Sequence, residues 1–211
     1  MKKRALLLVD VILAFFATGG LPVPSAEEIL AFLNKLMIEG DEDGPFDLII
    51  ASFEQHLPGN KYLASTYGLP PFTKKVIDGV EVILWDDHAM DGTVQVMFHP
   101  NLKKEYIQFC FRKGYDVNEH PFSMFEGYLM EDGVQLPMKV AEFLREHGIT
   151  DVTVVGLAYD FCAGDTAYDS AREGFTTRIL KAGCRSISLE GEVEMDEKLR
   201  DAGVEIIEEV A

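Results

Sequence analysis

The segment 151–175, DVTVVGLAYDFCAGDTAYDSAREGF, constrains the fold of this chain more than any other. It opens with a short apolar run, 152–157, in which four of six residues are β-branched, and this favours a buried strand over a helix. Positions 158–161 break the run. Alanines at 163, 167 and 171, with charged residues between them, then predict a helix. Cys162 therefore lies at a strand-to-helix turn.

Cys162 is a candidate nucleophile because of this position. A thiol at the start of a helix faces the positive end of the helix dipole, which lowers its pKa and raises the thiolate fraction. A buried structural cysteine is the alternative, since free cysteines are among the most buried residues.

The whole chain shows the same alternation of strand and helix. Strand-like runs recur at 5–9, 48–52, 107–111, 152–156, 177–180 and 205–207. Helical patterns cover 25–38, which starts with a capping box at Ser25, and 137–147, 163–173 and 194–202, which each end before a glycine. The alternation predicts an α/β fold: a three-layer sandwich with a central, mostly parallel six-stranded sheet and helices on both faces. We expect a single domain over 1–211.

Three polar residues fall at one edge of this predicted sheet. Asp10 follows the first strand, Lys113 the third and Cys162 the fourth. Ligands of such sheets bind beyond the carboxyl ends of the strands. Lys113 could hold the thiol as a thiolate while Asp10 moves protons. A strand-end ion pair between Asp10 and Lys113 is the alternative, because sequence spacing does not show that the three residues meet.

A second group contains two histidines and a carboxylate. Glu54 and His56 are two residues apart and would face the same side of an extended stretch, and His88 follows 32 residues later. Such a set could hold Zn²⁺, Mn²⁺ or Fe²⁺. Solvent-exposed loop residues are the alternative. All three lie within the irregular section 53–104, and a connection of that length usually has a functional role in a compact domain.

Composition excludes some classes of partner. A net charge of −17 disfavours nucleic acid, which is bound through neutralisation of its phosphates. No segment reaches the about 20 apolar residues of a membrane span. The basic and apolar N-terminus begins like a secretory signal, but Asp10 interrupts it and 5–9 fits a buried strand equally well. Three scattered cysteines indicate a reducing, cytoplasmic location.

Five motifs, in order along the chain, resemble those of the nicotinamidase/pyrazinamidase branch of the isochorismatase-like cysteine hydrolases. They are LLLVD ending at Asp10, SFEQH at 52–56, WDDHAMDGT at 85–93 with FHP at 98–100, RKG at 112–114, and VVGLAYDFC at 154–162. GF at 174–175 and AGCRS at 182–186 follow as in the family. The match covers nearly the whole chain, and five motifs in family order are far more specific than any one.

The resemblance implies the isochorismatase-like fold and an amidohydrolase that converts nicotinamide into nicotinate and ammonia through a cysteine thioester, a reaction of NAD salvage. It implies that Asp10, Lys113 and Cys162 are catalytic. Asp10 would take the thiol proton and Lys113 would stabilise the thiolate. Backbone N–H groups of Ala158 and Cys162 would face the oxyanion. The family has a non-proline cis peptide just before the residue that matches Ala158.

The resemblance also implies the groups that bind the substrate. Glu54, His56 and His88 would hold a divalent metal, with Zn²⁺ as the first candidate and Mn²⁺ or Fe²⁺ as alternatives, and the metal would orient the ring through the pyridine nitrogen. Phe15 and Trp85 match aromatic positions that flank the ring. A small-molecule amide is thus the expected partner, without nucleic acid or membrane. A homo-oligomer is compatible with the sequence.

The chain departs from the family pattern around these residues. The family continues its first motif as Gln-Asn-Asp-Phe, and residues 12–15 here are Ile-Leu-Ala-Phe. Glu54 replaces an aspartate, Ala89-Met90 a Cys-Val pair, and Tyr159 a small residue. Two alternatives therefore stay open: another isochorismatase-like amidase acting on a small carbamoyl or ureido compound, and a non-catalytic binding protein on this scaffold. The retained metal residues favour nicotinamide as the substrate over a small carbamoyl or ureido compound.

Overall fold

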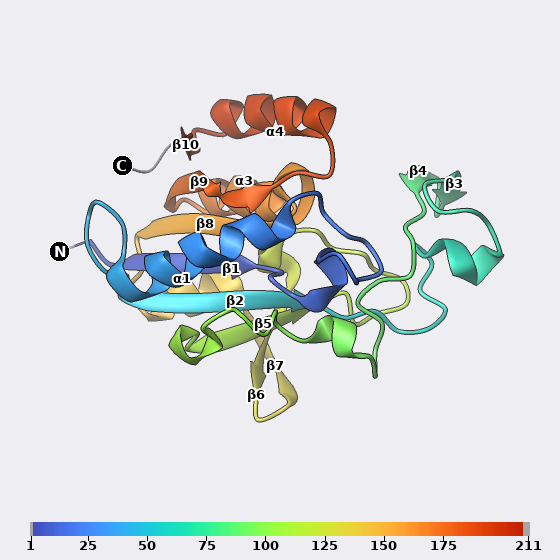
Figure 1. Cartoon of the computed structure of the whole chain (residues 1–211), viewed down its shortest axis with the longest axis horizontal. Helices are drawn as coiled ribbons and strands as arrows, with labels where there is room; N and C mark the ends of the chain where they lie inside the picture. The colour runs from blue at the N-terminus through green and yellow to red at the C-terminus, as the bar shows by residue number, and fades with distance from the viewer. Residues whose placement is uncertain (1, 209–211) are drawn as a thin grey trace.

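An eight-stranded sheet forms the centre of the fold in the computed structural model, which describes residues 2–208. Its strands are β1 (Arg4–Val9), β2 (Leu48–Glu54), β5 (Phe109–Lys113), β6 (Tyr128–Glu131), β7 (Val134–Lys139), β8 (Asp151–Leu157), β9 (Thr176–Arg185) and β10 (Glu205–Ile207). They lie in the order β10-β9-β8-β1-β2-β5-β6-β7, and every neighbouring pair from β10 to β5 is parallel (Figure 1). β6 and β7 extend the sheet as an antiparallel hairpin.

Helices cover both faces of the sheet. The α-helices of the described residues are α1 (Ile29–Glu39), α2 (Val140–Glu146), α3 (Gly164–Arg172) and α4 (Leu189–Asp201). Successive side chains of β1 point to opposite faces. Leu6 and Leu8 therefore pack in the same core cluster as the apolar side of α1, whereas Leu7 and Val9 pack in the cluster that contains the buried residues of α2, α3 and α4. The fold is thus a three-layer sandwich.

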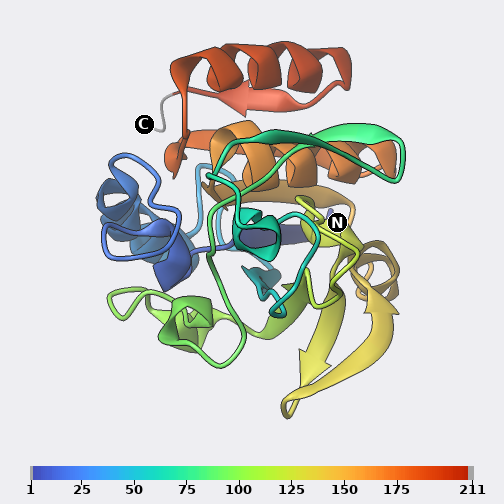
Figure 2. The same ribbon diagram turned by 90° about the vertical axis from the view of Figure 1, so that its right-hand side faces the viewer.

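Short elements occupy the loops. A π-helical turn, Tyr159–Ala163, joins β8 to α3. The 3-10 helices are Leu13–Phe15, Ala26–Glu28, Ala64–Tyr67, Val94–Val96, Lys104–Tyr106 and Met124–Glu126. β3 (Lys74–Ile77) and β4 (Val80–Ile83) form a separate hairpin at the end of the molecule to which the parallel strands point, and Figure 2 looks onto that end. No helix within residues 2–208 is long and apolar enough to span a membrane.

The predicted fold class is confirmed, and all six predicted runs overlap the six parallel strands. The predicted number of strands is wrong, because the β6–β7 hairpin adds two to the sheet. An Asp-Gly pair was the available signal for both unpredicted hairpins. Asp132-Gly133 joins β6 to β7 and Asp78-Gly79 joins β3 to β4, with positive φ at all four residues, as two-residue hairpin turns require.

Three helix boundaries also differ from the prediction. The last predicted helix covers 194–202, and α4 starts five residues earlier, at Leu189, where Ser188 caps it by accepting from the Gly191 N–H. Pro137 lies in β7 and α2 starts only at Val140. β7 is an edge strand, where proline is tolerated because its missing N–H need not join the ladder. Ser25 has φ 57° and its side chain makes no capping hydrogen bond, so the predicted capping box is wrong. The predicted stops hold: Gly148, Gly174 and Gly203 all have positive φ.

Candidate active site

The structure brings Asp10, Lys113 and Cys162 together at the carboxyl edge of the sheet. Asp10 directly follows β1, Lys113 ends β5, and Cys162 lies in the π-helical turn after β8. Lys113 Nζ is 2.9 Å from Asp10 Oδ2 and donates a hydrogen bond to Cys162 Sγ at 3.3 Å. All three side chains are buried. Neighbouring parallel strands end at one edge, so residues separated by about a hundred positions in the chain meet there.

Lys113 makes three hydrogen bonds in addition to its ion pair with Asp10. Besides Cys162, its ammonium donates to Glu54 Oε1 at 2.9 Å and to the Pro121 carbonyl at 3.3 Å, which uses the three protons of a lysine. Asp10 Oδ2 is paired with Lys113 by charge but, among the described residues, accepts no hydrogen bond. That oxygen therefore keeps a lone pair for a proton from another donor.

Ser52 supports Asp10 and was not predicted from the sequence. It lies on β2, is fully buried, and donates from Oγ to Asp10 Oδ1 at 2.8 Å. The backbone N–H of Asp10 also donates to Ser52 Oγ, at 3.2 Å. One oxygen of the carboxylate is thus held by Ser52, and the other faces Lys113.

Burial sets the protonation of these groups. It raises the pKa of Asp10 above the ordinary aspartate value, although the charge of Lys113 opposes the shift. It also raises the pKa of Cys162 well above the ordinary thiol value, again against Lys113. The expected lowering of the Cys162 pKa by a helix dipole is therefore wrong. The thiol is buried beside two carboxylates, those of Asp10 and Glu54, which disfavour a further negative charge.

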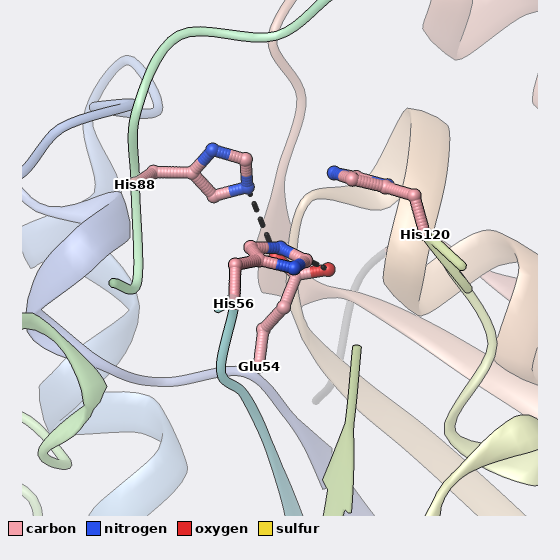
Figure 3. A group of neighbouring side chains, drawn as sticks. All are labelled: Glu54, His56, His88 and His120. Carbon is pink, nitrogen blue, oxygen red and sulfur yellow. Dashed lines mark hydrogen bonds and ion pairs between the residues drawn. The ribbon is translucent and has the colours of Figure 1, made fainter. Parts of the chain in front are cut away.

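The predicted metal residues Glu54, His56 and His88 also meet, and Figure 3 shows the two imidazoles around the carboxylate. Glu54 Oε2 is 3.2 Å from His88 Nε2, and Glu54 Oε1 is 3.5 Å from His56 Nε2. Each Nδ1 lies against a backbone carbonyl: that of Gly114 at 3.3 Å for His56 and that of Asp86 at 2.7 Å for His88. A carbonyl only accepts, so each Nδ1 carries a proton, and each Nε2 is left to face Glu54, either as a donor in the protonated ring or with a lone pair in the neutral one.

This donor set fits a divalent metal. The Nε2 atoms of His56 and His88 face carboxylate oxygens of Glu54, and a neutral imidazole with its proton on Nδ1 is compatible with that contact only when a cation lies between the two acceptors. Burial opposes ionisation of Glu54, but the charge of Lys113 and contact with His56 hold its pKa well below the ordinary value. A buried carboxylate with imidazoles oriented by carbonyls is the usual environment of a zinc or iron site.

A fourth residue, His120, joins this group and was not predicted. One ligand atom from each of Glu54, His56, His88 and His120 lies within 4.8 Å of the others. Burial lowers the pKa of His120 well below the ordinary value, which keeps the imidazole neutral. No metal-ligand spacing relates His120 to the other residues, and only its position shortly after the RKG motif pointed to this edge of the sheet.

A small pocket with mainly apolar walls opens between the two groups. Phe15 and Trp85, the predicted ring-flanking residues, both line it, as do Glu54, His88 and Cys162. The lining residues not predicted from the sequence are Leu21, His120, Phe122, Phe161 and Ile187. A flat, mostly apolar ligand with a polar group at each end matches this arrangement of walls and polar groups.

The turn that carries Cys162 has the predicted backbone features. The Leu157–Ala158 peptide bond is cis, as the resemblance implies, and both Ala158 and Cys162 line the pocket. Tyr159, where the family has a small residue, is buried under α4, and its hydroxyl donates to Asp196. Its side chain therefore leaves the pocket and ties the turn to the neighbouring helix.

Comparison with known proteins agrees with this geometry. Residues 85–209 match the model of the isochorismatase domain. The nicotinamidase of Escherichia coli is 30% identical over 190 residues, which cover 90% of this chain and 86% of the relative. The nicotinamidase/pyrazinamidase of Mycobacterium tuberculosis is 30% identical over 205 residues, which cover 97% of this chain and 98% of the relative.

Solved structures give the same result. A nicotinamidase/pyrazinamidase of Acinetobacter baumanii is 29% identical, with a TM-score of 0.85 over 99% of this chain and 97% of that one. A yeast nicotinamidase bound to the inhibitor nicotinaldehyde is 22% identical and shares the fold, with a TM-score of 0.82 over 98% of this chain and 100% of that one. The chain belongs to the isochorismatase family, on its nicotinamidase/pyrazinamidase branch.

Proposed function

We propose that this protein hydrolyses nicotinamide to nicotinate and ammonia, with Cys162 as the nucleophile. The family relationship supports the reaction, and one observation supports its assignment to these residues. Lys113 Nζ contacts Cys162 Sγ at 3.3 Å and Asp10 Oδ2 at 2.9 Å, in a buried group beside an aromatic pocket. A thiol, a carboxylate with a free lone pair and a fixed cation together suit nucleophilic attack on an amide.

Acylation follows from the positions of these groups. Asp10 Oδ2 takes the thiol proton as Cys162 Sγ attacks the carboxamide carbon, so a C–S bond forms and the carbonyl oxygen becomes an oxyanion. Lys113 stabilises the developing thiolate, and the N–H groups of Ala158 and Cys162 would receive the oxyanion. The C–N bond then breaks. Ammonia leaves with the proton held by Asp10, and a thioester remains on Cys162.

Deacylation uses the same carboxylate in reverse order. Water attacks the thioester carbon while Asp10 Oδ2 accepts one of its protons. The C–S bond breaks, the nicotinate carboxyl group is released, and the proton returns to Cys162 Sγ. Burial raises the Asp10 pKa above the ordinary aspartate value, which makes this carboxylate a stronger base for both proton transfers.

Glu54, His56 and His88 would hold the divalent metal, with Zn²⁺ as our first candidate and Mn²⁺ or Fe²⁺ as alternatives. When bound, the metal would orient the pyridine ring through its nitrogen. Phe15 and Trp85 would flank the ring. The substrate would therefore be held at its ring end by the metal side of the pocket and at its amide end by the Cys162 side.

Cys110, Cys162 and Cys184 are all free thiols, and we propose a reducing location such as the cytoplasm.

Ammonia release from nicotinamide tests the proposal. Wild type, Cys162→Ala and Cys184→Ala are assayed side by side, each with and without added Zn²⁺, Mn²⁺ and Fe²⁺. Cys184 is a matched control, because it is also buried but lies on β9 and burial raises its pKa to about 12. We expect Cys162→Ala to lose at least about 10³-fold in turnover while its melting temperature is kept, and Cys184→Ala to stay active.

The outcomes separate the remaining candidates. Release that needs both Cys162 and a metal supports nicotinamide hydrolysis, whereas residual turnover above a tenth of wild type in Cys162→Ala contradicts covalent catalysis. If no ammonia is released from nicotinamide with any of the metals, small carbamoyl and ureido compounds are the next substrates to assay. The polar residues that follow Asp10 in the family are replaced here by buried Ile12 and Ala14, which is the observation that favours that second candidate. Binding of nicotinamide without turnover, in wild type and in Cys162→Ala alike, would favour a binding protein.

A further inference from the structure

His120 is a half-buried residue whose two ring nitrogens are buried and have no hydrogen-bond partner among the described residues. Most buried polar atoms in proteins are paired, and an unpaired one costs about 1–3 kcal/mol. The arrangement at His120 therefore calls for a partner that is not a protein atom.

The backbone around His120 is held from both sides. On the preceding residue, the Glu119 carbonyl accepts a hydrogen bond of 2.9 Å from the side chain of Asn60, which is fully buried. On the following residue, the Pro121 carbonyl accepts one of 3.3 Å from Lys113. The imidazole therefore enters the site on a fixed segment, tied at one end to the same lysine that contacts Cys162.

The ring of His120 stacks on His56 beside the metal group, so it must rotate to bind the same ion, because an imidazole ligates in its own plane. Its centroid lies 4.7 Å from that of His56, with the planes 15° apart, and 5.7 Å from that of His88. Figure 3 shows His120 reaching this group from a different segment than the other three residues. One of its nitrogens is within 4.8 Å of the ligand atoms of Glu54, His56 and His88.

An aromatic wall is the plainer explanation. His120 lies parallel to Trp85, with centroids 6.1 Å apart and planes at 14°, and both line the pocket. A wall of this kind needs only a flat ring. Phenylalanine would provide one without burying two polar nitrogens, as Phe122 does two residues later in the same pocket. The wall alone therefore does not explain the imidazole.

We propose that His120 is a fourth protein ligand of the divalent metal, which makes the complete set one carboxylate and three imidazoles. The inference rests on the proposed function only in requiring a metal at Glu54, His56 and His88, and it does not depend on which amide is the substrate. A substrate atom can then reach the metal only if the ion accepts more than four ligands. The additional imidazole should also tighten metal binding.

Cobalt binding tests this inference without turnover. Metal-free wild type, His120→Phe and His147→Gln are titrated with Co²⁺ against a competing chelator, and the visible absorption of bound Co²⁺ is recorded. His120→Phe keeps a ring in the wall and removes both nitrogens. His147 is the matched control, because it is exposed and its Nδ1 bonds the Phe143 carbonyl in its own helix.

We expect His120→Phe to weaken Co²⁺ binding at least about tenfold, the loss that even outer-shell substitutions produce, and to change the spectrum, while His147→Gln binds like wild type. X-ray absorption of the wild-type Co²⁺ protein should count three imidazoles, a measurement that needs no variant. Two imidazoles, or an unchanged affinity and spectrum in His120→Phe, would overturn the role of His120 and leave nicotinamide hydrolysis untouched. A wild type that binds no Co²⁺ would overturn both this inference and the metal part of the proposed function.

Discussion

Two sides of the site differ in how their polar atoms are paired: the lysine side, with Lys113, Asp10 and Cys162, and the histidine side, with His56, His88 and His120. Around Lys113, every ammonium proton has a protein acceptor: Glu54, Pro121 and Cys162. Asp10 Oδ2, on the same side, accepts no hydrogen bond within the described residues but is paired with Lys113 by charge. In the histidine group, His56 Nε2 and both nitrogens of His120 have no hydrogen-bond partner within the described residues. Glu54 belongs to both sides. The protein itself thus supplies the cation on one side, whereas the other side is arranged to receive one.

The largest expected effect is that of Lys113→Met, which removes the built-in cation. Asp10 and Glu54 would be left as buried carboxylates without their counter-ion, and loss of one partner of a buried pair costs about 3–5 kcal/mol of unfolding free energy. Urea denaturation measures this loss. Lys181→Met is the control, because that lysine pairs with partly exposed carboxylates and should cost less. Equal losses in the two variants would contradict the contrast between the two sides.

The next effect is that of Asp10→Asn, which keeps the shape of the side chain but cannot accept a proton. Turnover should fall by about 10²–10⁴-fold. In wild type, kcat/KM should fall as the pH drops through the Asp10 pKa, because the base must be ionised, and this limb should lie above the ordinary aspartate value of 3.8. The profile is measured at saturating metal. If Asp10→Asn keeps some activity and its kcat/KM still falls at low pH as in wild type, the fall reports the titration of another group.

Removal of the metal should lower the stability of the protein only through the loss of ligation by the histidine side. Because the metal binds the folded protein and not the unfolded chain, it should add about 2.7 kcal/mol of stability at a hundred times its dissociation constant. Thermal unfolding with and without chelator measures the difference. The variant His88→Gln should lose this response, while Cys162→Ala should keep it. An identical melting temperature with and without metal in wild type would show that the group binds no ion.

The smallest expected effect is that of Tyr159→Phe, outside both sides. It removes the hydroxyl that donates to Asp196 and should cost about 1 kcal/mol of unfolding free energy. Turnover should change little, because the Tyr159 side chain is buried against α4 and does not line the pocket. A large drop in kcat with intact stability would instead make Tyr159 a positioning residue for the Cys162 turn.

Much of the fold could be predicted because its signals are local. Runs of β-branched and apolar residues predicted the six parallel strands, and the glycines after three helices predicted where those helices end. The antiparallel β6–β7 hairpin was missed because its residues are partly exposed and show no long apolar run, although the Asp132-Gly133 turn was readable. Edge strands carry weaker patterns because fewer of their side chains enter the core.

The sequence by itself determined which chemical groups arrive at the edge of the sheet, because strand ends and turns are set by neighbouring residues. It placed Asp10, Lys113 and Cys162 after their strands. Only the tertiary structure decided how those groups share protons and charge: that Glu54 contacts Lys113, and that His120 joins the histidines. These contacts depend on strand order and loop closure between distant segments, and on the exclusion of water, which raises the pKa of Cys162 where a local dipole argument had predicted the opposite.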